Sequence, residues 1–205
     1  MFDVSAKRIL PTLALSWCLL TGPLPGALAA EIYKFDKGHT EVFFGWSHAG
    51  VSMQHGEFTS ADGTLSLDPE KIEASTISVR IDANSVSTGV AALDKHLKSS
   101  SFLDVAKFPE ITFESTVVQR TGDKTAEVTG DLTIHGVTKP VTLKVTLTHR
   151  GYHPVGQYIS HYKGSWVAFA AETTINHLEF GVGSYPAGPS DKITIRINTE
   201  MKYQQ

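Results

Sequence analysis

Cysteine is almost absent from this chain of 205 residues, since Cys18 is the only one. A single cysteine cannot form a disulfide within the chain, and zinc sites built from cysteine pairs are excluded as well. Any fold that the chain adopts must therefore be held together by its hydrophobic core.

Long apolar runs and runs of basic residues are missing too. The apolar run at residues 9–20 is too short to span a bilayer, and the other apolar stretches are too short or too polar. We therefore expect no stable membrane insertion. The formal net charge is −3 and no basic run occurs, which argues against nucleic acid and anionic membrane surfaces as partners.

Catalytic and metal-binding signatures are equally scarce. The sequence has no Gly-x-Ser-x-Gly nucleophile elbow and no His-Glu-x-x-His zinc motif. Among the nine histidines, His149 and His153 would share a metal ion only in a turned conformation, because in a strand their side chains lie about 13 Å apart. We expect no enzymatic activity, no metal site and no cofactor.

The N-terminal segment has the order of a secretory signal peptide. The basic pair Lys7-Arg8 precedes the apolar run, and small residues follow it. We expect residues 1–30 to be a signal peptide that is cleaved near Ala29 or Ala30.

The mature chain, residues 31–205, is long enough for one domain with a sizeable core. Removal of Asp3, Lys7 and Arg8 with the signal peptide makes the formal charge one unit more negative. Lipidation at Cys18 is disfavoured, because Trp17 occupies a position where the lipoprotein peptidase needs a small residue.

Two-residue alternation of apolar and polar side chains dominates the mature chain. The clearest example is residues 127–147, where two alternating segments flank a turn at Gly136. Residues 75–82 and 191–203 alternate in the same way, whereas residues 89–98 have helical spacing. A succession of about eight long strands joined by turns, with one short helix, predicts an antiparallel barrel or sandwich.

Two local signals mark interruptions in this pattern. Lys37-Gly38 is expected to separate a first strand, residues 32–36, from a second strand, residues 39–48. Asp62-Gly63 is expected to form a turn, since this dipeptide is a strong hairpin signal.

The alternating segments carry an ordered set of short motifs. The set comprises His39-Thr40-x-Val42-x-Phe44, His48, Gly56-x-Phe58, Ser85-Val86-Ser87-Thr88, His96-Leu97-Lys98-Ser99, Phe102-Leu103-Asp104, Phe108-Pro109-x-Ile111-x-Phe113, Gly130-x-Leu132-Thr133-Ile134-x-Gly136-Val137-Thr138-Lys139-Pro140-Val141 and Phe180-Gly181-Val182. With this set the chain resembles the YceI family over essentially all of residues 31–205. The segment at residues 130–141 is the most specific part of the match.

The resemblance implies an exported, periplasmic bacterial protein. It also implies the fold class: an all-β, antiparallel eight-stranded lipocalin-like barrel with one short helical insertion, after a cleaved signal peptide. Some family members hold polyisoprenoid or other long amphiphilic lipids inside the barrel, and the resemblance implies no established reaction. One departure is visible, because His177 stands where family members often carry the arginine of Arg-x-x-Phe-Gly.

We therefore expect a periplasmic carrier that binds a long-chain amphiphilic lipid, polyisoprenoid or fatty-acid-like, non-covalently in the barrel. The candidate ligand-binding residues lie on the apolar faces of the strands, apart from one histidine of the helix. They are Val42, Phe44, Trp46, Phe58, Ile77, Val79, Ile81, His96, Phe113, Leu132, Ile134, Leu143, Val145 and Phe169.

The helix at residues 89–98 allows two interpretations. As a lid, it would hold Asp94, Lys95, His96 and Lys98 near a polar head group. As a cap, it would plug the barrel end with Leu93 and Leu97, and its charges would lie in water.

Two other functions stay open. The apolar faces would fill each other in a solid core if the protein were a stress-related interaction module. A hydrolase would need His39, His48 and Asp94 to meet in the fold. The sequence also leaves the oligomeric state open, including a homodimer.

Overall fold

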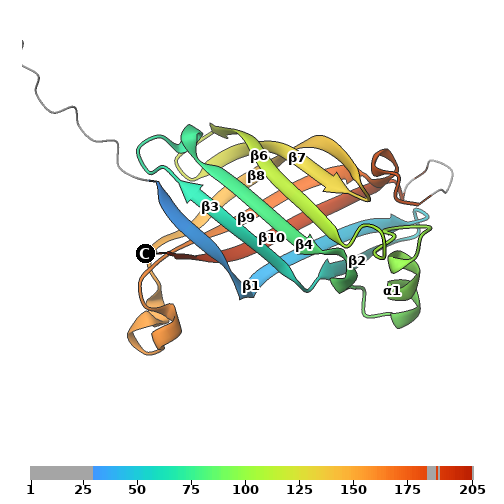
Figure 1. Ribbon diagram of the computed structural model, residues 1–205, viewed down its shortest axis with the longest axis horizontal. Coiled ribbons are helices and arrows are strands. Elements are labelled where there is room, and N and C mark those ends of the chain that lie inside the picture. Colours follow the sequence, from blue (N-terminus) through green and yellow to red (C-terminus); the bar gives the residue numbers. More distant parts are fainter. Residues whose placement is uncertain (1–29, 184–187, 189, 205) are drawn as a thin grey trace, which may run out of the picture.

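The computed structural model describes residues 30–183, 188 and 190–204. Apart from Ala30, the expected signal peptide lies outside the described residues. The described chain forms one antiparallel β-structure with a short helix beside one end (Figure 1). No helix in this part of the chain has both the length and the apolar character needed to cross a bilayer.

Ten strands, one α-helix and five short 3₁₀ helices make up the fold. The strands are β1 (Glu31–His48), β2 (Ser52–Phe58), β3 (Ala61–Leu67), β4 (Thr76–Asp82), β5 (Val86–Ser87), β6 (Glu110–Arg120), β7 (Thr125–Ile134), β8 (Val137–Tyr152), β9 (Ser165–Asn176) and β10 (Lys192–Tyr203). The helices are α1 (Ala91–Lys98), η1 (Ile72–Ala74), η2 (Ala83–Ser85), η3 (Pro154–Gln157), η4 (Ser160–Tyr162) and η5 (His177–Phe180).

The ten strands close into an eight-stranded barrel. β2 and β3 both pair with β1, one with each half of it, so they act as one strand interrupted at Thr59-Ser60. β4 and β5 are related in the same way, because β4 pairs with β3 and β5 with β2. β10 pairs with β1 and closes the barrel. The predicted fold class, an eight-stranded antiparallel barrel with one short helix, is confirmed.

The β7–β8 hairpin forms as the alternation predicts. Its register runs from Thr125, opposite Thr146, to Ile134, opposite Val137. Both turn residues have positive φ, 53° for His135 and 75° for Gly136, which is the conformation of the tight turns that suit the strand twist. The hairpin supplies two adjacent strands of the barrel wall.

β1 is a single strand, so the expected separation at Lys37-Gly38 is wrong. The segment produces only a register shift between Phe35 and Thr40, while pairing with β10 continues on both sides. A bulge of this kind bends a strand without ending it. The bend lets β1 pair with β3 in its first half and with β2 in its second half.

The expected turn at Asp62-Gly63 is also wrong, because both residues lie inside β3. A Cβ at Gly63 would lie 2.6 Å from Cζ of Phe35, closer than side-chain carbons approach. The glycine is therefore needed for the aromatic ring of the neighbouring strand to lie against the backbone, and not for a turn.

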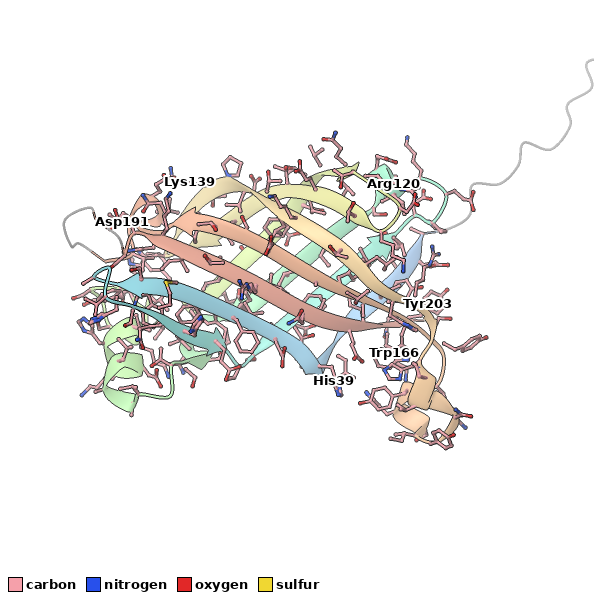
Figure 2. The ribbon with its side chains drawn as sticks, turned by 180° about the vertical axis from the view of Figure 1, so that it is seen from behind. His39, Arg120, Lys139, Trp166, Asp191 and Tyr203 are labelled. Carbon is pink, nitrogen blue, oxygen red and sulfur yellow. The ribbon has the colours of Figure 1, made fainter. Side chains whose placement is uncertain are left out.

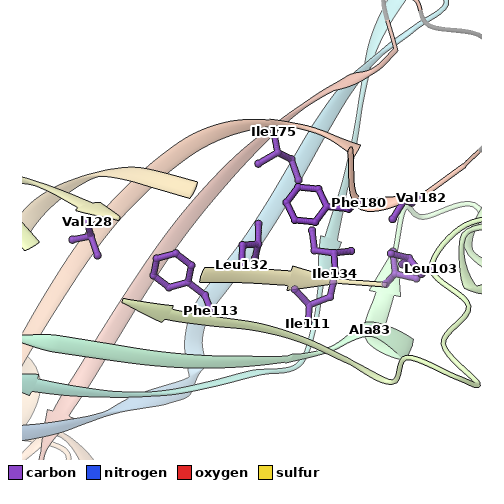
Figure 3. Close-up of a cluster of buried hydrophobic side chains, with 11 residues drawn as sticks. Ala83, Leu103, Ile111, Phe113, Val128, Leu132, Ile134, Ile175, Phe180 and Val182 are labelled. Carbon is purple, nitrogen blue, oxygen red and sulfur yellow. The ribbon is translucent and has the colours of Figure 1, made fainter. Parts of the chain in front are cut away.

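The two ends of the barrel are packed differently. At the α1 end, Phe180 and Val182 lie among Leu103, Ile134 and Ile175 in a cluster that extends inward along β6 and β7 (Figure 3). Figure 2 shows Asp191 and Lys139 toward this end, and Arg120 and Tyr203 toward the opposite one. A second cluster, composed of Tyr33, Leu65, Leu67, Val167 and Met201, lies between β1, β3, β9 and β10.

Gly63→Ala is expected to lower the free energy of unfolding by about 1–3 kcal/mol, the usual range for overpacking. Its Cβ would collide with the ring of Phe35. Urea unfolding followed by circular dichroism measures the loss. Gly38→Ala is the matched control, since its nearest neighbour would be Asp36 Oδ1 at 3.4 Å. Equal losses in the two variants would contradict the proposed fit between Gly63 and Phe35.

Candidate functional site

The interior of the barrel contains a cavity of about 1010 Å³. This is at the upper end of the range of about 300–1,000 Å³ that is common for small-molecule sites. Residues of β1, β2, β3, β4 and β6–β10 line it, so the whole circumference of the wall contributes. The solid-core interpretation requires a filled interior, and the structure does not have one.

All fourteen residues that the sequence singled out lie on the wall of this cavity. They are Val42, Phe44, Trp46, Phe58, Ile77, Val79, Ile81, His96, Phe113, Leu132, Ile134, Leu143, Val145 and Phe169. Two-residue alternation puts one face of each strand inward, and the apolar faces are the ones that line the cavity. Contact between these residues and a ligand stays a prediction.

Other lining residues were not selected from the sequence. Ile193, Ile195 and Ile197 of β10 face the cavity, and the alternation of that strand was a signal that could have identified them. Ala171 and Thr173 of β9 also line it, but their small side chains give little periodic contrast. The lining thus includes small as well as large side chains.

Aromatic rings whose tips lie over glycines of neighbouring strands help to keep the lumen open. Phe44 of β1 lies opposite Gly56 of β2, and a Cβ at Gly56 would be 2.4 Å from Cζ of the ring. Phe113 covers Gly130 in the same manner, at 2.5 Å. Each ring occupies space that a neighbouring side chain would otherwise fill, so it lies along the wall and leaves the lumen free.

The cavity is elongated along the strands. On β1 its lining extends from Phe35 to His48, about 40 Å of extended chain. A strand tilt of about 40° reduces this to roughly 30 Å along the barrel axis. Many inward apolar residues, including Ile77, Val79 and Leu143, remain partly accessible to solvent, as expected for walls around an unfilled space.

The titratable lining side chains gather at the α1 end, whereas Ser75, Thr76 and Thr199 line the cavity elsewhere. His48, His96, His177 and Asp191 line the cavity at the α1 end, whereas the side chains in the middle of the wall are mostly apolar. The titratable groups are therefore confined to one end of a lumen whose walls are otherwise mostly apolar.

Helix α1 has features of both interpretations. Leu93 and Leu97 face the cavity, as expected for a cap, and His96 also lines it, with its ring centroid 4.7 Å from that of Phe102. Asp94 does not line the cavity. Its carboxylate accepts hydrogen bonds from the backbone N–H and the hydroxyl of Thr88, both at 2.7 Å, and so holds the start of the helix.

His177 begins η5. Its Nδ1–H donates to the carbonyl oxygen of Val182. With Nδ1 as donor, a neutral imidazole leaves Nε2 as an acceptor. The residue therefore secures the η5 turn and adds a hydrogen-bonding ring to the α1 end of the cavity.

A polar contact marks the opposite end of the barrel. The Tyr33 hydroxyl donates to Glu31 Oε2 at 2.9 Å, and Arg150 Nη2 lies 3.3 Å from the same oxygen. Burial, together with the hydrogen bond to Glu31, raises the pKa of Tyr33 to about 12, so the hydroxyl stays protonated as a donor.

The hydrolase interpretation is not supported by the geometry. His39 and His48 are both on β1, about 30 Å apart along the strand, and Asp94 is bonded to Thr88. In the described part of the chain, no three His, Cys, Asp or Glu side chains gather in an arrangement that could hold a metal ion. The rings of His149 and His153 have centroids 6.4 Å apart.

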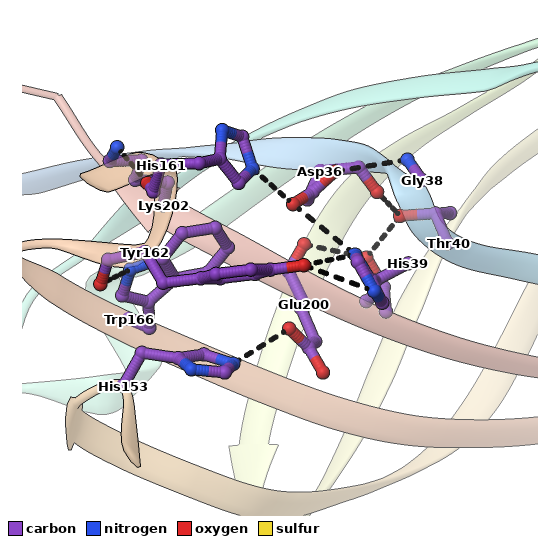
Figure 4. Close-up of polar contacts among 11 residues, drawn as sticks. Asp36, Gly38, His39, Thr40, His153, His161, Tyr162, Trp166, Glu200 and Lys202 are labelled. Carbon is purple, nitrogen blue, oxygen red and sulfur yellow. Dashed lines mark hydrogen bonds and ion pairs between the residues drawn. The ribbon is translucent and has the colours of Figure 1, made fainter. Parts of the chain in front are cut away.

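A second polar cluster lies outside the barrel, where residues 153–163 fold back on β1 and β10 (Figure 4). Asp36 accepts hydrogen bonds from His161 Nε2 at 2.8 Å and from the Gly38 N–H at 2.9 Å, and His39 Nδ1 lies 3.4 Å away. His153 Nε2 is 3.2 Å from Glu200. Nothing in the sequence pattern brought these residues together, because they come from distant segments.

The hydrogen bonds set the protonation state of Asp36. Partial burial by itself would raise the pKa of this carboxyl group, but the bonds from His161, Gly38 and His39 outweigh it and hold the pKa below its usual value of 3.8. Asp36 is therefore ionised at neutral pH and joins β1 to residues 153–163.

Comparison with known proteins identifies the family. A model described as the YceI-like domain matches residues 33–201. The chain belongs to the YceI-like domain family. Curated UPF0312 proteins of Pseudomonas putida strain F1 and Pseudomonas fluorescens strain SBW25 are 44% and 43% identical over 196 residues, which is 95% of this chain and 96% of each relative.

Solved structures share the fold of this YceI-like chain. Burkholderia cenocepacia BcnA superimposes with a TM-score of 0.68 at 22% identity, covering 81% of this chain and 98% of BcnA. The Campylobacter jejuni YceI protein gives 0.64 at 24% identity, with 73% and 84% covered. A polyisoprenoid binding domain from Saccharophagus degradans gives 0.63 at 11% identity, with 85% and 99% covered.

Enlarging a residue on the cavity wall of this YceI-like barrel is expected to lower the free energy of unfolding only slightly. Val145→Phe should change the free energy of unfolding by less than about 1 kcal/mol, because the new ring can enter the lumen. Val167→Phe should cost about 1–3 kcal/mol, because Val167 is fully buried within the second cluster. Chemical denaturation measures both, and similar large losses would contradict an unfilled interior.

The stabilising effect of Asp36 is expected to depend on pH. Its pKa is lowered in the folded protein, so its contribution is present above about pH 4 and is lost as the pH falls below 3.8 through the folded-state value. The stability difference between wild type and Asp36→Asn, measured by urea unfolding from pH 7 to pH 2.5, should shrink in that window. Asp123→Asn, at a fully exposed carboxylate, provides the baseline. A difference that is constant down to pH 2.5 would refute the assignment.

Proposed function

We propose that this protein is a periplasmic, non-enzymatic carrier that holds one long-chain amphiphilic lipid inside the barrel. The ligand is polyisoprenoid-like or fatty-acid-like and is bound without covalent attachment. Its hydrocarbon chain lies along the cavity against the fourteen residues predicted from the sequence. The N-terminal signal peptide accounts for export.

The observation that carries the proposal is an elongated lumen whose walls are apolar along their length. Burial of hydrocarbon in such a lumen is worth about 0.8 kcal/mol per methylene group. Ten methylenes would contribute roughly 8 kcal/mol, enough to leave useful affinity after the cost of association. A compact polar substrate would gain nothing comparable from these walls.

The position of the polar lining groups suggests the orientation of the ligand. His48, His96, His177 and Asp191 at the α1 end offer both donors and acceptors to a head group. The alkyl tail then extends toward Phe35 and Leu67. The fold shared with the Saccharophagus degradans polyisoprenoid binding domain supports an isoprenoid tail.

The proposal is tested with mature protein that has been stripped of lipid. A long-chain prenyl alcohol or palmitic acid should raise the melting temperature, since ligand at about 100 times its dissociation constant adds roughly 2.7 kcal/mol of stability. Mass spectrometry of an organic extract of the untreated protein should show a co-purified lipid. No thermal shift at saturating ligand, and no lipid in the extract, would refute the carrier function.

A matched pair of double variants tests where the ligand lies. Val145 and Ala171 are paired across β8 and β9 and face the cavity, whereas Thr146 and Ala170, one residue along, are paired on the outer face. Val145→Phe with Ala171→Phe should weaken binding at least about tenfold by narrowing the lumen. Thr146→Phe with Ala170→Phe should leave binding unchanged. Equal effects would place the ligand elsewhere.

The same assay separates the two interpretations of α1. Lys95→Ala with Lys98→Ala should weaken binding of palmitate, an anionic ligand, if the helix acts as a lid over the head group. Binding equal to that of the wild type would leave α1 as a cap that closes the barrel with Leu93 and Leu97.

A further inference from the structure

The β8–β9 connection projects from the barrel as a separate lobe (Figure 1). It consists of residues 153–163, called the excursion below, and contains η3 and η4. The other connections around that end of the barrel do not form such a lobe. A lobe of this kind needs an explanation, because a tight turn would be enough to join two antiparallel strands.

The base of the excursion is firmly fixed to the outer wall of the barrel. Trp166 points outward from β9 yet is only 1% exposed, because Tyr162, His153 and His161 cover its ring. Its indole Nε1–H donates to the carbonyl oxygen of Tyr162 at 3.0 Å. The hydrogen bonds from His161 to Asp36 and from His153 to Glu200 add two further attachments (Figure 4).

Several apolar side chains of the excursion, and of the strand end next to it, are exposed. Tyr152, at the end of β8, is 82% exposed, Tyr158 is 80% exposed and Ile159 is 49% exposed. Val155 adds a further exposed apolar side chain. These four residues, called the apolar tip, share one short segment that is held on a rigid base. Four exposed apolar side chains within residues 152–159 are a denser group than the scattered single exposures that need no explanation.

The sequence around the apolar tip lacks the acidic residues that are found elsewhere in the chain. Residues 140–171 contain no Asp or Glu, although the chain has 21 of them in 205 residues. Lys163 on the excursion is exposed and forms no ion pair with any described residue. The carboxylates closest to the excursion, Asp36 and Glu200, lie beneath it and contact its histidines.

We propose that the excursion docks the protein on an anionic lipid bilayer, with the apolar tip inserted at the level of the head groups. Tyrosine favours this interface because its ring is apolar and its hydroxyl can stay hydrated. Lys163 and the absence of carboxylates make the tip compatible with anionic head groups. The inference rests on the proposed carrier function, since a carrier of an insoluble lipid must meet the membrane that supplies or receives it.

The negative charge of the whole chain does not prevent this contact. Charges separated by more than about 8–10 Å are largely screened at physiological ionic strength. The excursion projects beyond the barrel (Figure 1), so the barrel strands stay farther from the bilayer than the excursion does. The local composition of the tip therefore decides the contact, and the charge-based argument against anionic surfaces does not apply to it.

Vesicle flotation with the full mature protein tests the proposal. The protein should float with vesicles of phosphatidylcholine and phosphatidylglycerol in a 7:3 ratio, and about tenfold less with phosphatidylcholine alone. Tyr158→Ser with Ile159→Ser should reduce flotation on the mixed vesicles about tenfold, and Lys163→Glu should reduce it severalfold. Higher salt should weaken the contribution of Lys163.

Val51→Ser with Met53→Ser is the matched control, because these two exposed apolar residues lie in the β1–β2 hairpin at the α1 end. Its flotation should equal that of the wild type. Palmitate-induced thermal shifts should be unchanged in all three variants, which separates failure of docking from failure of the carrier function. Wild-type protein that does not float, or a loss confined to the Val51 and Met53 variant, would overturn the proposal.

Discussion

The structure depends on the closure of the barrel by β1 and β10. These strands come from opposite ends of the described chain, and they pair from Tyr33, opposite Tyr203, to Trp46, opposite Ile193. Closure leaves neither strand with an open edge, which removes a route to aggregation and fixes which face of each strand points inward. The only cysteine of the chain lies in the expected signal peptide. This pairing therefore holds the two ends of the domain together, a role that disulfides have in many exported domains.

Once the barrel is closed, alternation determines the chemistry of the interior. Every wall strand contributes one apolar face, and rings such as Phe44 and Phe113 lie over glycines along the wall. The size of the lumen is therefore set by where glycines and small residues occur as much as by the number of strands. Apart from His48 at the end of β1, the titratable groups of the α1 end come from helices and a loop, which are free of the alternation constraint.

The sequence could predict the strands, their inward faces and the thirteen strand residues among the fourteen on the cavity wall, because these depend on a local period of two. It could not predict features that depend on distant partners. The turn expected at Asp62-Gly63 was wrong, because Gly63 lies inside β3 and makes room for the ring of Phe35 on another strand. The cluster of Asp36, His161 and Trp166 was missed because these residues meet only through the fold.

An empty apolar lumen of this size is an unfavourable resting state. Apolar side chains around an unfilled cavity lack partners on one side and lose dispersion contacts, which is why cavities destabilise folded proteins. Walls made of Ile, Val, Leu and Phe give water few hydrogen-bond partners. A flexible hydrocarbon chain can fill an elongated lumen without such partners, so the architecture itself favours a lipid-bound state.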